Sequence, residues 1–153
     1  MSAQQSNQNA GNSKEAERTW QMLFLSWFVA LTSTVAVLFI GEIMGQEPCV
    51  LCWYQRAFMF PLAVVLGVAC YLSDPRIWRY ALPMAIFGWV FAAYHTLLVA
   101  DVIPKPLEPC GEGTSCTSDD MMIFTVVPIP LLSVGAFGAI IVLLLLIRKR
   151  LQS

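Results

Sequence analysis

Four long apolar stretches, separated by shorter polar segments, dominate the pattern of the chain. They cover residues 20–40, 53–72, 80–100 and 128–147, and none holds an acidic residue. A transmembrane helix needs about 20 predominantly apolar residues, each adding about 1.5 Å of rise. Because backbone groups in lipid must be hydrogen-bonded within their own segment, these stretches are expected to be helical. The pattern therefore predicts an all-α integral membrane protein, a four-helix transmembrane bundle.

Composition supports lipid as the solvent of this chain. The 153 residues are 58% hydrophobic and only 12% charged, whereas soluble domains carry about 25% charged residues. A soluble domain of this size has too little interior to hide so much apolar surface. We therefore expect membrane lipid as the main surrounding and no nucleic acid partner.

The polar segments divide the chain into a membrane domain and two tails. Residues 1–19 are rich in Gln, Asn and Ser at their start and are predicted to form a disordered cytoplasmic tail. Residues 20–147 form a single four-helix membrane domain, and residues 148–153 form a basic cytoplasmic tail. The first apolar stretch lacks a small-x-small cleavage pattern after it, which argues against a cleaved signal peptide.

Basic residues are distributed unevenly between the two ends of the predicted helices. Four spans place both termini and the segment 73–79 on one side. That side holds seven basic residues, and the other holds only Arg56 and Lys105; the seven are Lys14, Arg18, Arg76, Arg79, Arg148, Lys149 and Arg150. By the positive-inside rule the termini are cytoplasmic. The protein is thus expected in a bacterial cytoplasmic (inner) membrane, with two loops facing the periplasm or exterior.

Four of the five cysteines fall in these two outer loops, one pair in each. Cys49 and Cys52 lie in the first loop, and Cys110 and Cys116 lie in the second. Disulfides persist on that side of the membrane. Cys70 is 18 residues beyond Cys52, about 27 Å along a helix, so it is expected to pack as a small apolar residue.

The first pair is a Cys-x-x-Cys motif at the predicted start of the second helix. A thiol at a helix N-terminus is biased towards the thiolate by the helix dipole. Arg56 follows Cys52 by four residues, which places its charge on the same helix face one turn deeper. These two effects predict a redox-active Cys49–Cys52 pair in which Cys52 is the thiolate.

The second pair closes a short loop with two glycines between Cys110 and Cys116. A disulfide across so short a loop adds little stability, which favours a Cys110–Cys116 pair that exchanges. Two alternatives remain open. In the first, both disulfides are purely structural; in the second, the four cysteines bind zinc, although only acidic residues lie nearby to support a metal.

Arg56 and His95 are the polar residues that we expect beneath the outer surface. An arginine inside a membrane helix is a functional candidate by default, although it can also snorkel to the headgroups. His95 is the only histidine and lies about 9 Å inside the third helix, where it can equally be a hydrogen-bonded packing residue. Together they are predicted to line one pocket below Cys52 that suits a polar, electron-accepting head group.

A known family shares these features. Residues 47–56, Glu-Pro-Cys-Val-Leu-Cys-Trp-Tyr-Gln-Arg, closely resemble the signature of the disulfide bond formation protein B family (DsbB, with its BdbC-like branch). The resemblance extends over about residues 20–147, including Tyr94-His95-Thr96, the second cysteine pair and the four spans. It implies a membrane thiol:quinone oxidoreductase that reoxidises a DsbA/BdbD-like thioredoxin-fold oxidase, with ubiquinone or menaquinone as its cofactor and no metal.

The resemblance also implies roles for single residues. Cys110 would engage the reduced partner and Cys116 would relay to Cys49, while Arg56 and His95 would bind the quinone. The loop-two cysteines are only six positions apart, as in the BdbC-like branch, so the order of exchange between them is not fixed.

Two other interpretations compete with this one. The first is a non-enzymatic tetraspan subunit with two structural disulfides, against which Arg56 stands. The second is a vitamin K epoxide reductase-like enzyme, whose active Cys-x-x-Cys lies late in the chain rather than after the first helix.

Overall fold

The computed structural model describes residues 2–43, 45, 48–100, 122–123 and 127–152. Its long helices are α1 (Ser2–Leu38), α2 (Val50–Leu72), α3 (Trp78–Val99) and α4 (Ile129–Gln152). A π-helical turn, η1 (Phe39–Ile43), continues α1, and a 3-10 turn, η2 (Pro75–Ile77), precedes α3. Strands β1 (Met122–Ile123) and β2 (Val127–Pro128) form a small antiparallel pair ahead of α4.

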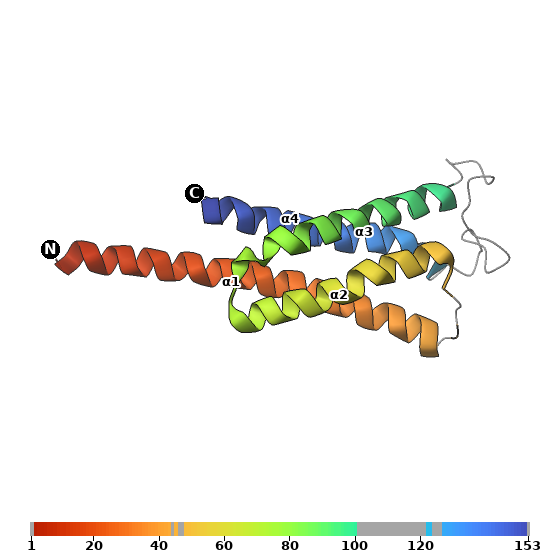
Figure 1. Cartoon of the computed structure of the whole chain (residues 1–153), viewed down its shortest axis with the longest axis horizontal. Coiled ribbons are helices and arrows are strands. Elements are labelled where there is room, and N and C mark those ends of the chain that lie inside the picture. Colours follow the sequence, from red (N-terminus) through yellow and green to blue (C-terminus); the bar gives the residue numbers. More distant parts are fainter. Residues whose placement is uncertain (1, 44, 46–47, 101–121, 124–126, 153) are drawn as a thin grey trace.

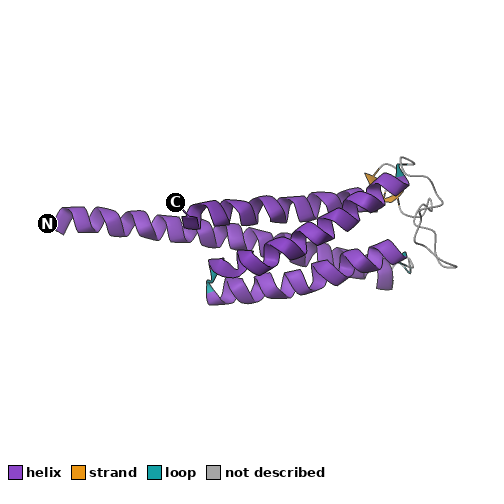
Figure 2. Ribbon diagram, turned by 45° about the horizontal axis from the view of Figure 1, so that its top comes forward, coloured by secondary structure: helices purple, strands orange, loops and turns teal. Residues whose placement is uncertain are grey.

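The long helices form a four-helix bundle in which each one packs mainly on two others. Helix α1 contacts α2 and α4, and α3 contacts the same two (Figures 1 and 2). Together with η1 and η2 they provide four spans long and apolar enough to cross a membrane, namely Ser13–Ile43, Val50–Leu72, Pro75–Val99 and Pro130–Gln152. The predicted transmembrane bundle is confirmed. Its core is built by apolar residues of all four helices, including Leu23, Leu62, Leu66, Ala85, Phe137, Ile140 and Leu144.

Large apolar side chains also cover the outside of the bundle. Val64, Val68 and Tyr71 of α2 are exposed, as are Phe87 and Val90 of α3. In water such surface would be strongly unfavourable, whereas lipid tails solvate it at no cost. The bundle is therefore apolar both inside and outside, as expected for a membrane protein.

The bundle has two chemically different ends. Both termini and the α2–α3 turn lie towards one end, and the N-terminus of α2 lies at the other (Figure 1). The α2–α3 turn is tight because Ser73 adopts a left-handed conformation (φ 50°) and caps α2. Asp74 then accepts a hydrogen bond from the Arg76 backbone N–H and caps η2. The turn returns the chain directly into α3, so the N-terminal end of α2 (Val50) and the C-terminal end of α3 (Val99), here called the outer ends, lie side by side.

The first nineteen residues differ from their sequence prediction. They are predicted to be disordered, but α1 is one continuous helix from Ser2 and projects beyond the other three (Figure 1). No proline interrupts this segment. Extending an existing helix costs much less than nucleating one, so the apolar span of α1 supports the polar turns before it. Likewise α4 continues through the basic residues to Gln152.

Candidate functional site

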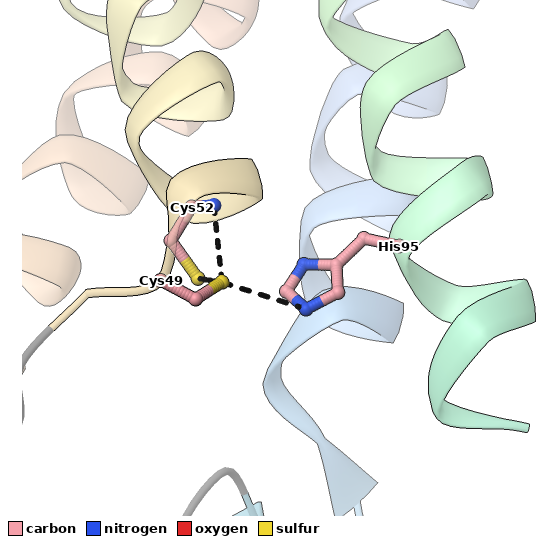
Figure 3. Close-up of side chains that lie close together, drawn as sticks. All are labelled: Cys49, Cys52 and His95. Carbon is pink, nitrogen blue, oxygen red and sulfur yellow. Dashed lines mark hydrogen bonds between the residues drawn. The ribbon is translucent and has the colours of Figure 1, made fainter. Parts of the chain in front are cut away.

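Cys49 and Cys52 lie at the N-terminus of α2 with their sulfurs 3.0 Å apart, as unbonded thiols (Figure 3). Cys49 is the N-cap residue, with extended backbone angles (φ −67°, ψ 168°). Its sulfur accepts the backbone N–H of Cys52 at 3.4 Å, as an N-cap side chain does for the free donors of the first turn. The cap and the first helical turn together bring the two sulfurs into contact.

The helix start corrects the sequence prediction of which cysteine carries the thiolate. The sequence places the start of α2 near Trp53 and therefore assigns the helix-end effect to Cys52. The structure begins α2 at Val50, so the sulfur that accepts the helix-end N–H belongs to Cys49. Helix-end donors and the positive end of the dipole act mainly on the cap and first turn. The geometry thus favours Cys49 as the thiolate of the reduced pair.

The surroundings of Cys49 also favour its thiolate form. A hydrogen bond from the Cys52 thiol lowers the pKa of Cys49 most strongly, burial opposes this, and His95 lowers that pKa further. Cys49 is 2% exposed, whereas Cys52 is half-buried. The two sulfurs therefore differ in kind: one is electrostatically stabilised and buried, and the other can be reached from outside.

His95 of α3 faces the cysteine pair, as the sequence predicts. Its Nε2 lies 3.8 Å from the Cys49 sulfur (Figure 3), and its Nδ1 lies 2.9 Å from the side-chain nitrogen of Gln55. His95 is 1% exposed. The imidazole therefore bridges α2 and α3 beneath the pair. Whether it also contacts a quinone stays a prediction.

Packing around the pair fixes the outer ends of α2 and α3 against each other. Cys49 lies in a small apolar cluster with Leu51 and Leu98. One turn deeper, the rings of Tyr54 and Phe91 stack with centroids 5.1 Å apart. These contacts set the register in which His95 meets Cys49.

The side chain of Arg56, which belongs to α2, extends to α1. Its Nη2 donates to the Val37 carbonyl at 3.0 Å, and its guanidinium lies 5.5 Å from the Trp53 ring centroid. Gly41 leaves room for it, since an added Cβ there would lie 2.9 Å from Nη2. Arg56 is thus fixed by α1, a contact that a snorkelling side chain does not need. Arg56, on α2, is thus held on the α1 side of the bundle, whereas His95 reaches the pair from α3. Whether the two line one pocket stays a prediction.

The other three cysteines divide between two regions. Cys110 and Cys116 lie outside the described residues, so their disulfide and their roles stay predictions. Cys70 lies near the opposite end of α2, where it packs against the main core and its carbonyl accepts a hydrogen bond from the Trp20 indole.

Gln55 is the site residue that the sequence interpretation did not select. It is 8% exposed and holds His95 through its side-chain amide. Two signals point to it in retrospect. It is a polar residue inside a membrane span, and it lies three positions after Cys52, on the same helix face.

Comparison with known proteins agrees with this geometry. The family model described as "Disulfide bond formation protein DsbB" matches residues 17–147. A "Probable disulfide formation protein" of Metapseudomonas resinovorans is 54% identical over 140 residues, covering 91% of this chain and 97% of the relative. The "Disulfide bond formation protein C" of Bacillus subtilis (strain 168) is 38% identical over 128 residues, covering 82% and 91%. No solved structure matches significantly. The chain thus combines a membrane bundle and a thiol pair at the N-terminus of one helix with a match over most of its length. It belongs to the DsbB family, and its role lies in disulfide formation.

Proposed function

We propose that the protein reoxidises an extracytoplasmic thioredoxin-fold disulfide donor and passes the electrons to a membrane quinone. The observation that carries this proposal is the Cys49–Cys52 contact of 3.0 Å at the mouth of a membrane helix. A purely structural disulfide needs no polar support, yet here two buried polar side chains, Gln55 and His95, stand behind the pair. Buried polar groups in a membrane protein are costly and usually serve function.

The electrons enter at the second loop and leave at the first. A partner dithiolate attacks the Cys110–Cys116 disulfide, and a second attack releases the partner as a disulfide. The Cys110–Cys116 dithiol then reduces the Cys49–Cys52 disulfide in the same way. Each exchange moves two electrons and is faster when the leaving thiolate has a low pKa. The lowered pKa of Cys49 makes its sulfur the better leaving group when the incoming thiolate attacks Cys52, whereas the family resemblance implies attack at Cys49.

The reduced Cys49–Cys52 pair must then lose two electrons and two protons, and a bound quinone supplies the acceptor for both. Half-buried Cys52 is the sulfur that such a ring can reach, because Cys49 is enclosed. The Cys52 thiol donates its proton to the Cys49 sulfur in the 3.0 Å contact, so Cys52 must lose this proton as its electrons pass to the acceptor. This division makes Cys52 the quinone-facing residue, although Cys49 holds the charge at rest.

Arg56 and His95 fit the binding of a quinone from two sides. The guanidinium of Arg56 is held near the end of α1, one turn below Cys52, where a cation stabilises negative charge on a reduced carbonyl oxygen. The His95 ring lies on the α3 side of the pair. We place the site at the extracytoplasmic face of a bacterial cytoplasmic membrane, because the basic residues concentrate at the opposite end of the bundle.

The test combines purified protein, a short-chain quinone and a reduced thioredoxin-fold partner. Quinone reduction should disappear in Cys52→Ser and continue in Cys70→Ser, which is the matched control thiol. A double variant, Cys110→Ser with Cys116→Ser, should lose the partner-driven reaction but keep quinone reduction by a small dithiol that reaches Cys49–Cys52 directly. An unchanged rate in Cys52→Ser would reject the route through Cys52, and no quinone reduction by the wild type would instead support a subunit with structural disulfides.

A further inference from the structure

Three metal-binding side chains converge at the outer end of α2 and α3. The ligand atoms of Cys49, Cys52 and His95 all lie within 4.8 Å of one another. We propose that the reduced pair and His95 form a Zn²⁺ site, and that the ion holds the pair in its dithiolate form. This site differs from a four-cysteine zinc site, because it uses a histidine from the membrane interior and needs no residue of the second loop.

The distances suit zinc with a small adjustment. Tetrahedral Zn²⁺ with bonds of about 2.3 Å to sulfur and about 2.0 Å to nitrogen separates two sulfurs by about 3.8 Å, and a sulfur from a nitrogen by about 3.5 Å. The Cys49 sulfur lies 3.8 Å from His95 Nε2, close to that value. The two sulfurs, now 3.0 Å apart, must separate by less than 1 Å (roughly, from the same geometry). Half-buried Cys52 can move in this way, since one side of it is open.

Charge favours a divalent ion over a monovalent one. Two thiolates and a neutral imidazole carry a charge of about −2 in total, which Zn²⁺ cancels. A neutral complex avoids the large cost of leaving a net charge in a buried site. Cys49 and His95 are 2% and 1% exposed, so these two ligands are buried where a net charge is costly. A monovalent ion such as Cu⁺ would leave one negative charge uncompensated.

Gln55 can support His95 both with and without the metal. In the structure its side-chain N–H donates to Nδ1, which places the ring proton on Nε2, facing Cys49. Metal binding requires a bare Nε2 and moves that proton to Nδ1. A half-turn of the Gln55 amide then presents its oxygen to the Nδ1–H, because an amide carries a donor and an acceptor in interchangeable positions. Metal-binding histidines commonly have such an acceptor on their second nitrogen.

Zinc binding changes the protonation of the pair and leaves its oxidation state unchanged. With Cys49 already a thiolate in the reduced pair, each ion displaces the Cys52 thiol proton, and no electrons move. Both sulfurs are then occupied and can neither form a disulfide nor attack an acceptor. One consequence rests on the proposed function: zinc would act as a reversible inhibitor that stops electron transfer at the reduced pair.

The binding experiment uses the full-length reduced protein without quinone or partner, so it does not depend on the proposed activity. Zn²⁺ is titrated against a chromophoric chelator. We expect one ion per chain, and no binding after the wild-type protein has been oxidised to disulfides. This oxidised control needs no substitution, so it stays informative even where a variant folds poorly. Equal binding by the oxidised protein would overturn the proposal.

Matched variants locate the ligands. Cys49→Ser and Cys52→Ser should abolish the site, and Gln55→Leu should weaken binding by about 10- to 100-fold, because His95 loses the partner that orients its ring. His95→Ala should weaken it at least as much. Cys70→Ser and the Cys110→Ser, Cys116→Ser double variant should bind normally. Loss of binding in that double variant, or unchanged binding in His95→Ala, would reject this ligand set.

Discussion

The side-chain nitrogen of Gln55 and Nδ1 of His95 lie 2.9 Å apart, joining α2 to α3 beneath the cysteine pair. Both side chains are buried, at 8% and 1% exposure. Since the amide donates to Nδ1, the imidazole proton is left on Nε2, 3.8 Å from the Cys49 sulfur. Gln55 thus determines which form of His95 meets the thiolate, although Gln55 itself does not contact the sulfur in this arrangement.

Gln55→Leu should destabilise the bundle and disturb the cysteine pair. A buried hydrogen bond that loses one partner costs about 1–3 kcal/mol, whereas replacing both partners by apolar groups costs much less. Adding His95→Leu to Gln55→Leu should therefore cost little more than Gln55→Leu alone. Thermal unfolding of the single and double variants in detergent measures this coupling. Costs that simply add would mean that the two side chains act independently.

The lowered pKa of Cys49 predicts a pH-dependent stability of the reduced protein. Its ordinary value is 9.0, and the folded value is lower because of the Cys52 hydrogen bond. A group with a depressed folded pKa contributes stability that is fully present above its unfolded pKa and is lost as pH falls through the folded one. In metal-free buffer, the reduced protein should therefore gain stability over Cys49→Ser as pH rises from about 5 to about 9. Cys70→Ser should follow the wild type, and a constant difference across this range would show that Cys49 is not a stabilised thiolate.

The fold was largely predictable because lipid imposes a simple rule on the sequence. Long apolar runs must be helices there, and their lengths set the spans. Helix ends were less predictable, since no lipid boundary marks them. The start of α2 at Val50 depends on the capping geometry of Cys49, and α1 continues to Ser2 because a polar segment without proline can extend an existing helix.

The site was only partly predictable, because spacing along one helix reveals a shared face but not the partner helix. The relation between Cys52 and Arg56 follows from four-residue spacing. That Arg56 binds the Val37 carbonyl while His95 binds Gln55 depends on how the helices rotate in the bundle. The sequence predicts the thiolate on Cys52, whereas the structure favours Cys49, because α2 starts three residues earlier than predicted.

Gly41→Ala should weaken quinone use without changing any charge. The new methyl group would lie 2.9 Å from Arg56 Nη2, so the guanidinium must move away from the Val37 carbonyl. If Arg56 stabilises a bound quinone, the quinone concentration for half-maximal rate should rise severalfold, and further in Arg56→Ala. Loss of one charge-assisted hydrogen bond, about 1.5–3 kcal/mol, sets the upper range. An unaltered concentration in Arg56→Ala would assign Arg56 to anchoring α2 alone.

Gly88→Ala tests whether the bundle packs as described, at a contact that involves no residue of the cysteine pair. Gly88 of α3 is buried, and a Cβ there would collide with the ring of Phe137 on α4, which is 1% exposed. Overpacking of this kind costs about 1–3 kcal/mol, and the melting temperature should fall accordingly. Gly135→Ala, on the same helix as Phe137 but with nothing within 4 Å of the new methyl, is the matched control and should melt like the wild type.

Phe137→Leu should relieve the collision, so the double variant with Gly88→Ala should be more stable than the sum of the two single changes predicts. Equal melting of Gly88→Ala and Gly135→Ala would show that α3 and α4 do not meet at this position.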